Sequence, residues 1–248
     1  MPKLVASRGY PLHYPENTAV GIEAAIAAGA RLISVDIQLS RDGVPVLFQD
    51  RTLERVCGRP GTIHEHTADG LRDLYAMDFG RFGYKFSGTP IMRLAELVEL
   101  LQHYSNVTSF IELRRVSVDR FGATTVATRA LQVIEPAASQ CVITSKSMEG
   151  LLALRRLGWQ SIGAVFDQWM EREHPLLNKI DPGFLFCGID SLPRWRRPRF
   201  RRCRLGVFET SDPEKATQTA KRGIEFVHTA AIGEMLAQAN RRRSDRQV

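Results

Sequence analysis

The stretch LISVDIQLSRDGVPVLF, residues 32–48, decides the fold of this chain. It holds two short runs rich in Val, Ile and Leu, at 32–37 and 44–48, and such runs are typical of buried strands. The QLSRDG segment between them is too short for a crossover helix, and Asp42-Gly43 is a hairpin-type turn signal. We therefore expect a hairpin here, and an irregularity in any strand–helix repeat that surrounds it.

Similar apolar runs alternate with segments of helical period along the whole chain. This alternation is typical of parallel strands covered by helices, as in a barrel or a doubly wound sheet. The strand candidates are 4–7, 32–37, 44–48, 107–113, 140–145, 161–166, 184–189, 205–208 and 225–228. The helix candidates are 18–28, 94–104, 119–134, 147–157, 168–179, 212–222 and 231–241. The first helix has Asn17 and Thr18 as capping residues and Gly29 after its end.

Length and strand count favour one barrel. The chain has 248 residues and 44% hydrophobic content, which is enough for a single full core. Nine strand candidates exceed an eight-stranded closure, in agreement with the irregularity at 32–48. We expect one domain, 1–248, folded as an irregular (β/α)8 TIM barrel. Residues 51–90 are loop-like and weakly helical, and we expect this small insertion after the third strand to lie over the barrel mouth.

The net charge of +7 is concentrated in one segment, RWRRPRFRRCR, from Arg194 to Arg204. This segment holds seven arginines and no acid, so the rest of the chain is near neutral. A solvated loop face explains such a charge run. Contact with an anionic membrane or with RNA explains it too, because Trp195 and Phe200 lie among the cations.

The cysteine spacing, the N-terminal residues and the length of the apolar runs indicate the cellular compartment and argue against some types of site. The four cysteines show neither C-x-x-C spacing nor histidines at zinc-ligand spacing, which argues against a disulfide framework and a zinc site. The N-terminal MPKLVASRGY lacks the pattern of a signal peptide. Apolar runs are of strand length, well below the roughly 18 residues of a membrane-spanning helix. We expect a soluble, cytoplasmic protein.

Polar side chains stand at the carboxyl ends of several of the predicted strands. In a barrel, catalytic and binding residues gather at the carboxyl ends of the strands. The strand-end residues of interest are Ser7, Arg8, Asp36, Gln49, Glu112, Arg114 and Lys146. The carboxylates of Asp36 and Glu112 are ligands suited to Mg²⁺ or Ca²⁺, and Arg8 has the geometry to hold a phosphate oxygen. These residues predict a phosphoester pocket, and buried ion pairs at strand ends are the structural alternative.

The order of short motifs along the chain resembles the glycerophosphodiester phosphodiesterase family. That family has HRG, PENT, IExD, LTxDG, VxHD and ExK in sequence. This chain has SRG (7–9), PENT (15–18), ISVD (33–36), LSRDG (39–43), LFQD (47–50) and IELR (111–114). IMRLAEL at 91–97 and GIEFVHT at 223–229 extend the resemblance over nearly the whole chain.

The resemblance implies a catalytic apparatus that this chain has lost in part. Two histidines act as general acid and base in the family, and their positions here are Ser7 and Gln49. Neither side chain transfers protons near neutral pH, so no intact catalytic residue remains. Three carboxylates hold the family's metal, and the first is Ser34 here. Asp36 and Glu112 remain as ligands for Mg²⁺ or Ca²⁺, and the missing ligand weakens the site.

The resemblance further implies a small phosphate-bearing ligand, with Arg8, Glu16 and Arg114 as its binding residues. Arg114 replaces a family lysine, which keeps the charge and changes its geometry. The favoured hypothesis is a glycerophosphodiester phosphodiesterase-like protein, catalytically impaired or inactive, that binds a glycerophosphodiester or phospholipid-derived ligand.

Two alternatives stay open. The first is an active phosphoric diester hydrolase of lipid metabolism with an altered acid or base, for which His13, His64 and His66 are the candidates near the mouth. The second is an interaction protein that uses the arginine-rich segment on an anionic membrane or RNA. No role is predicted for the other three histidines, His103, His174 and His228.

Overall fold

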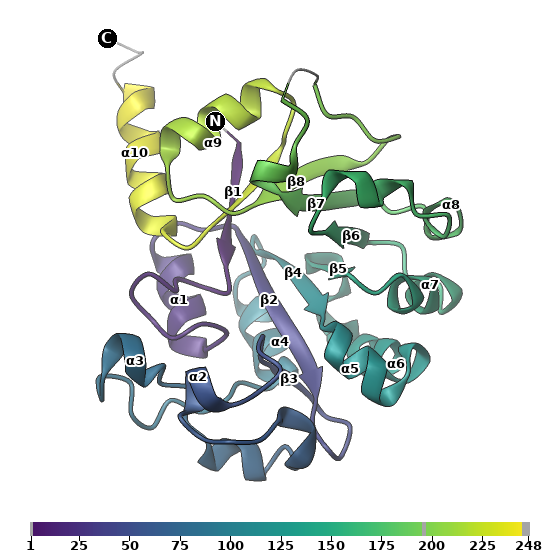
Figure 1. Ribbon diagram of the computed structural model, residues 1–248. Helices are drawn as coiled ribbons and strands as arrows, with labels where there is room; N and C mark the ends of the chain where they lie inside the picture. Colours follow the sequence, from purple (N-terminus) through teal and green to yellow (C-terminus); the bar gives the residue numbers. More distant parts are fainter. Residues whose placement is uncertain (1, 195–196, 245–248) are drawn as a thin grey trace.

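The computed structural model describes residues 2–194 and 197–244, and its parallel strands close into a barrel (Figure 1). The strands of the ring are β1 (Lys3–Ser7), β2 (Leu32–Leu39), β4 (Thr108–Leu113), β5 (Cys141–Ser145), β6 (Ile162–Phe166), β7 (Phe184–Gly188), β8 (Arg204–Phe208) and β9 (Phe226–Thr229). The ring closes because β1 pairs in parallel with both β2 and β9. The predicted (β/α)8 TIM barrel is confirmed.

The irregularity expected at residues 32–48 is a hairpin. Strand β3 (Pro45–Leu47) lies outside the ring and pairs antiparallel with β2, with Ile37 opposite Leu47. Gly43 in the connecting turn has φ 77°, a conformation that glycine adopts without steric cost. The strand candidate at 44–48 is therefore a real strand that takes no part in closing the barrel, and the other eight candidates form the ring.

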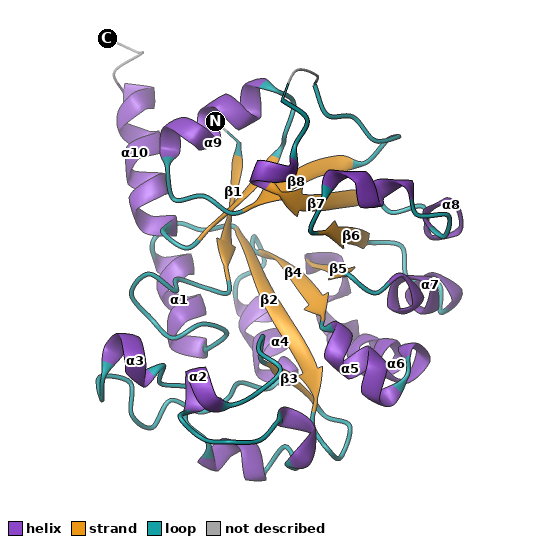
Figure 2. Cartoon of the chain, in the orientation of Figure 1, coloured by secondary structure: helices purple, strands orange, loops and turns teal. Residues whose placement is uncertain are grey.

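Helices surround the ring of strands (Figure 2). They are α1 (Ala19–Ala27), α4 (Leu94–His103), α5 (Arg115–Phe121), α6 (Ala123–Ile134), α7 (Met148–Arg156), α8 (Leu177–Ile180), α9 (Pro213–Lys221) and α10 (Ile232–Ser244). Thr18 caps α1 as expected, and its side chain accepts a hydrogen bond from the Gly21 amide at 3.3 Å. Across 2–194 and 197–244, no helix has the length and apolar character needed to cross a membrane.

Two helix predictions were wrong in their extent. The segment 119–134 spans parts of α5 and α6, which are separated because Gly122 has φ 83°. The segment 168–179 is a 3-10 turn, Trp169–Glu173, followed by the short α8. It breaks there because Pro175 restricts the preceding residue to extended conformations and has no amide hydrogen to continue a helix.

Residues 51–90 form a small unit packed against β3. The unit contains α2 (Glu54–Cys57), α3 (Phe79–Phe82) and 3-10 turns at Ile63–Glu65 and Gly70–Asp73. It has its own apolar cluster, separate from the barrel core, in which Phe48, Leu53, Val56, Cys57, Ile63, Leu71 and Ile91 are buried. The segment is therefore a folded insertion, as expected. That it covers the barrel mouth stays a prediction.

The barrel interior is filled largely by aromatic rings. Phe110, Phe186 and Phe226 are buried there, with ring centroids 5.2 to 6.1 Å apart. Gly206 of β8 makes room for them, since a Cβ at this position would lie 2.3 Å from the Phe186 ring. These rings fill the barrel interior, and Phe110 and Phe186 form the apolar floor of the cavity above them.

Candidate ligand site at the barrel mouth

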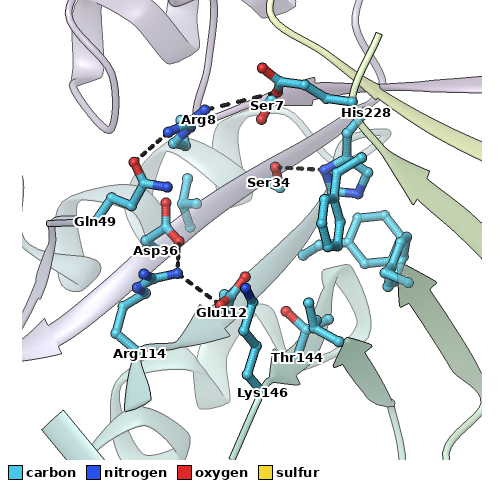
Figure 3. A pocket seen from close by; sticks show the side chains of 16 residues that line it. Ser7, Arg8, Ser34, Asp36, Gln49, Glu112, Arg114, Thr144, Lys146 and His228 are labelled. Atoms are coloured by element: carbon cyan, nitrogen blue, oxygen red, sulfur yellow. Dashed lines mark hydrogen bonds and ion pairs between the residues drawn. The ribbon is translucent and has the colours of Figure 1, made fainter. Parts of the chain in front are cut away.

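A cavity of about 200 Å³ opens at the carboxyl ends of the ring strands (Figure 3). Its polar lining consists of Ser7, Arg8, Ser34, Asp36, Gln49, Glu112, Arg114, Thr144, Lys146, Glu209 and His228. Its apolar lining consists of Val35, Phe110, Val165, Phe186 and Phe208. Strand-end residues predicted from five separate segments thus lie around one space. A ligand there meets charged groups on one side and aromatic rings on the other.

The turn after β1 carries Arg8 into the cavity. Arg8 has φ 57° and is followed by Gly9 at φ 92°, so the chain turns sharply where the strand ends. A side chain at Gly9 is excluded because its Cβ would lie 2.8 Å from the Gly21 backbone. The Arg8 guanidinium donates a hydrogen bond to Gln49 Oε1 and lies 3.8 Å from Glu209 Oε2. Arg8 is therefore held at the mouth, with a fifth of its side chain exposed.

Glu16 lies behind Arg8. Within the described chain it is buried and is not among the side chains that line the cavity. Its carboxylate accepts a 2.7 Å hydrogen bond from Arg55 and lies 3.4 Å from Arg8 Nη1. At this location Glu16 is an ion-pair partner of Arg8, and its contact with a ligand stays a prediction.

Asn17 fixes the carboxylate of Asp36, a role that sequence reasoning missed. The Asn17 amide nitrogen donates to Asp36 Oδ2 at 3.2 Å, and the Asp36 backbone amide donates to Asn17 Oδ1 at 3.0 Å. Asn17 is held in this position because its backbone amide donates a hydrogen bond to the Arg8 carbonyl at 3.0 Å. The sequence contained part of this signal, because Asn17 of the PENT motif directly precedes the capping residue Thr18. The burial of Asn17 is visible only in the structure.

Arg114 joins the two carboxylates predicted as metal ligands. Asp36 and Glu112 lie opposite each other in the pairing of β2 with β4. Arg114 Nη1 lies 3.3 Å from Asp36 Oδ1 and 2.9 Å from Glu112 Oε1, as the dashed lines in Figure 3 mark. One guanidinium nitrogen thus contacts both carboxylates.

Burial changes the proton affinity of this cluster. Burial, and after it the neighbouring Asp36, raise the pKa of Glu112 to about 7, although Arg114 works against the rise. Burial also raises the pKa of Asp36, again against the effect of Arg114. Although burial works to lower the pKa of Arg114, the two carboxylates outweigh it and raise that pKa. Arg114 is therefore a permanent cation between two carboxyl groups whose ionisation costs free energy.

These residues do not fit the divalent cation that the sequence predicted. Among residues 2–194 and 197–244, no three His, Cys, Asp or Glu side chains gather closely enough to hold a metal ion. Ser34, at the third ligand position, lies with its Oγ 3.3 Å from His228 Nδ1. Mg²⁺ and Ca²⁺ take six or more oxygen ligands, and here the two remaining carboxylates already contact Arg114.

His228, to which the sequence assigned no role, lines the cavity. It is partly buried, and its ring packs edge-on against Phe186 with centroids 5.1 Å apart. Burial, followed by the nearby Arg8, lowers the pKa of His228 to about 3, so the ring is neutral at physiological pH. Phe226 and His228 are two residues apart in β9 and therefore lie on the same face of the strand. This spacing was the available sequence signal for His228. Its use depends on knowing that Phe226 faces the barrel interior.

The histidines considered as relocated acids or bases lie elsewhere. His13 Nε2 is 2.7 Å from Glu234 Oε1 near the start of α10, and His64 packs edge-on against Phe121. His66 also lies outside the cavity lining of the described residues. Position therefore gives no support to a catalytic role for any of the three.

Comparison with known proteins identifies relatives with the same fold. Residues 8–156 match the model of the Glycerophosphoryl diester phosphodiesterase family. A glycerophosphodiester phosphodiesterase of Caldanaerobacter subterraneus is 35% identical over 99 residues, which are 40% of each chain. Glycerophosphodiester phosphodiesterase 1 of Mus musculus is 34% identical over 111 residues, 44% of this chain and 33% of the relative. The chain thus matches less than half the length of these relatives.

Solved structures extend the likeness over the full barrel. A phosphodiesterase of Oleispira antarctica in complex with the product sn-glycerol-3-phosphate has a TM-score of 0.80, 20% identity and 97% coverage of both chains. A glycerophosphodiester phosphodiesterase of Parabacteroides distasonis has a TM-score of 0.77 at 20% identity, covering 97% of this chain and 98% of its own. At such identity the likeness establishes the fold.

Proposed function

The chain belongs to the glycerophosphoryl diester phosphodiesterase family, and from this premise we propose that it binds a phosphate-bearing ligand and hydrolyses it slowly or not at all. The ligand belongs to the glycerophosphodiester or phospholipid-derived class. One observation carries the proposal. The cavity contains the cations of Arg8, Arg114 and Lys146, whereas Ser7 and Gln49 stand at the positions where the family resemblance implies histidines.

The cationic side chains of the cavity suit a phosphate group. Arg8 and Arg114 present guanidinium groups, which bind phosphate oxygens in a bidentate manner, and Lys146 adds a compact charge at the end of β5. The product sn-glycerol-3-phosphate in the Oleispira structure supports a ligand of this class in a barrel of this shape. The aromatic floor is suited to the carbon chain of such a ligand.

The same geometry argues against efficient hydrolysis. A phosphodiester is cleaved when one group removes a proton from the nucleophile and another gives one to the leaving alkoxide. Gln49 instead accepts a hydrogen bond from Arg8, and its amide is neither protonated nor deprotonated near neutral pH, so it cannot act as a general acid or base. Loss of positioned acid–base catalysis typically costs about 10²–10⁴-fold per group. The pocket retains binding groups and lacks the proton-transfer groups.

A hydrolysis assay tests this proposal. Glycerophosphocholine is incubated with the purified protein, and release of sn-glycerol 3-phosphate is compared with that of the Arg8→Met variant. We expect equal background rates, together with calorimetric binding of sn-glycerol 3-phosphate that the variant loses. Turnover well above the Arg8→Met background that disappears in Glu112→Ala would contradict the impaired-enzyme part. Absence of binding to the wild-type protein would contradict the ligand part.

His228 favours a second candidate function, a working hydrolase with an altered acid or base. It is the one histidine in the cavity lining of the described chain, and its Nε2 has no hydrogen-bond partner among the described residues. Its pKa of about 3 makes it a weak base. Replacing His228 with alanine, with His174→Ala as a surface control, separates the two functions. Only the second candidate predicts an activity that the His228 variant loses.

Membrane or RNA contact through Arg194 to Arg204 stays a prediction. Residues 195–196 lie outside the described part of this segment. Two of its arginines have partners within the protein: Arg201 contacts the Leu177 carbonyl, and Arg204 lies 2.7 Å from Glu225. Binding to anionic vesicles or RNA that weakens steeply with salt is the expected sign of such contact. A cytoplasmic location likewise stays a prediction.

A further inference from the structure

We propose that the guanidinium of Arg114 takes the place of the divalent cation between Asp36 and Glu112, so that this site needs no Mg²⁺ or Ca²⁺. The part of this inference that concerns ligand binding rests on the proposed function. The part that concerns the cation rests on this chain's own residues.

The first argument is the position of the Arg114 charge. The strand pairing places Asp36 directly opposite Glu112, and a cation between two such carboxylates relieves their mutual repulsion. Arg114 Nη1 lies 3.3 Å from one carboxylate and 2.9 Å from the other. A divalent ion at the same point would meet this nitrogen at repulsive distance. Metal binding therefore requires that Arg114 first leave both carboxylates.

The second argument is the loss of the third carboxylate. Ser34 brings a neutral hydroxyl, engaged 3.3 Å from His228 Nδ1, to the position where the family resemblance implies an acid. With only Asp36 and Glu112 present, one monovalent cation from the protein leaves a single net negative charge. The family resemblance implies a lysine at 114, so Arg114 keeps a charge already expected there. What differs in this chain is the loss of the third acid and the contact of one guanidinium with both remaining carboxylates.

Direct measurement of metal binding tests the cation part without any ligand. Mn²⁺ is titrated into the protein, and free Mn²⁺ is followed by electron paramagnetic resonance. We expect no stoichiometric binding to the wild-type chain at millimolar Mn²⁺. We expect one equivalent to bind when Ser34→Glu is combined with Arg114→Gln. Because that variant places a new acid in the mouth, Ser34→Glu with Arg114→Lys serves as a second version, and Arg115→Gln is the surface control.

The result that overturns the inference is one equivalent of Mn²⁺ on the wild-type protein that is lost in Asp36→Asn. Failure of both double variants to gain Mn²⁺ binding, when circular dichroism shows them folded, also counts against it. The wild-type titration decides the question even if neither double variant folds.

A second arm separates this inference from the proposed function. sn-Glycerol 3-phosphate is titrated into the wild-type protein by calorimetry, with EDTA and then with millimolar Mg²⁺ or Ca²⁺. We expect dissociation constants that agree within about twofold, because the cation is part of the protein. A weakening of about tenfold or more by EDTA would overturn the inference. Absence of binding in every buffer would refute the proposed function, while the Mn²⁺ result still stands on its own.

Discussion

Replacing Arg114 with methionine is the perturbation whose cost follows most directly from the structure. The variant leaves Asp36 and Glu112 facing each other without their shared cation. The contacts of Nη1 at 2.9 and 3.3 Å correspond to gross attractions of about 6 and about 5 kcal/mol at an effective dielectric constant of about 20. Desolvation offsets much of this, and removing one partner of a buried ion pair typically costs about 3–5 kcal/mol.

Partial exposure lowers the expected loss. A quarter of the Arg114 side chain is exposed to solvent, so water screens part of the interaction. We expect the free energy of unfolding at pH 8 to fall by about 2–4 kcal/mol. At pH 5.5 the loss should be smaller, because Glu112, with its pKa already raised to about 7, is then protonated in the variant and carries no charge.

Urea unfolding at both pH values measures this loss, and Arg115→Met is the matched control. The Arg115 side chain is 74% exposed and lies 3.7 Å from Asp119, so its replacement should change stability by less than about 0.5 kcal/mol. If the Arg114 and Arg115 variants lost equal stability, Arg114 would not neutralise buried carboxylates. Equal losses at pH 5.5 and pH 8 for the Arg114 variant would refute the electrostatic reasoning in the same way.

Three further predictions concern the barrel. The pKa of Glu112 is about 7 in the folded protein, against the ordinary value of 4.5 in the unfolded chain. Between these two pH values only the folded protein keeps the Glu112 proton. The free energy of unfolding therefore falls by about 1–3 kcal/mol as the pH rises through this window. Glu112→Gln should flatten the pH dependence of the unfolding free energy there, and an unchanged slope would contradict the raised pKa. Gly206→Ala should destabilise by about 1–3 kcal/mol, since its Cβ would meet the Phe186 ring at 2.3 Å, whereas Gly80→Ala, with open space around it, should be nearly neutral in thermal unfolding. Thr18→Ala should cost about 1 kcal/mol in urea unfolding through loss of the α1 cap, and no loss would show that the cap is dispensable.

The strands could be predicted from the sequence because parallel strands in a barrel are buried on both faces. Apolar runs therefore mark them directly, and each strand candidate coincides with a strand of the described chain. Helix ends were harder. Helical periodicity continues across Gly122, and only the positive φ of that glycine separates α5 from α6. The break before Pro175 has a sequence signal, because proline restricts the residue before it.

The site could be predicted in part for a similar reason. Carboxyl ends of parallel strands lie on one side of a barrel, so Arg8, Asp36, Glu112 and Arg114 had to approach one another. Which groups then touch depends on side-chain direction, and a list of strand ends does not contain it. The contact of Arg114 with both carboxylates and the place of Glu16 behind Arg8 were missed for that reason.

The most direct test of the central claim is a crystal structure of the protein soaked with glycerophosphocholine. We predict density for the intact diester in the cavity, with its phosphate within hydrogen-bond distance of Arg8 and Arg114 and its carbon chain over the aromatic floor. Density for sn-glycerol 3-phosphate alone after a soak of a few minutes, with intact diester in crystals of the Glu112→Ala variant, would show efficient cleavage and contradict the loss of catalysis. An empty cavity with Arg8 turned away from it would contradict ligand binding itself.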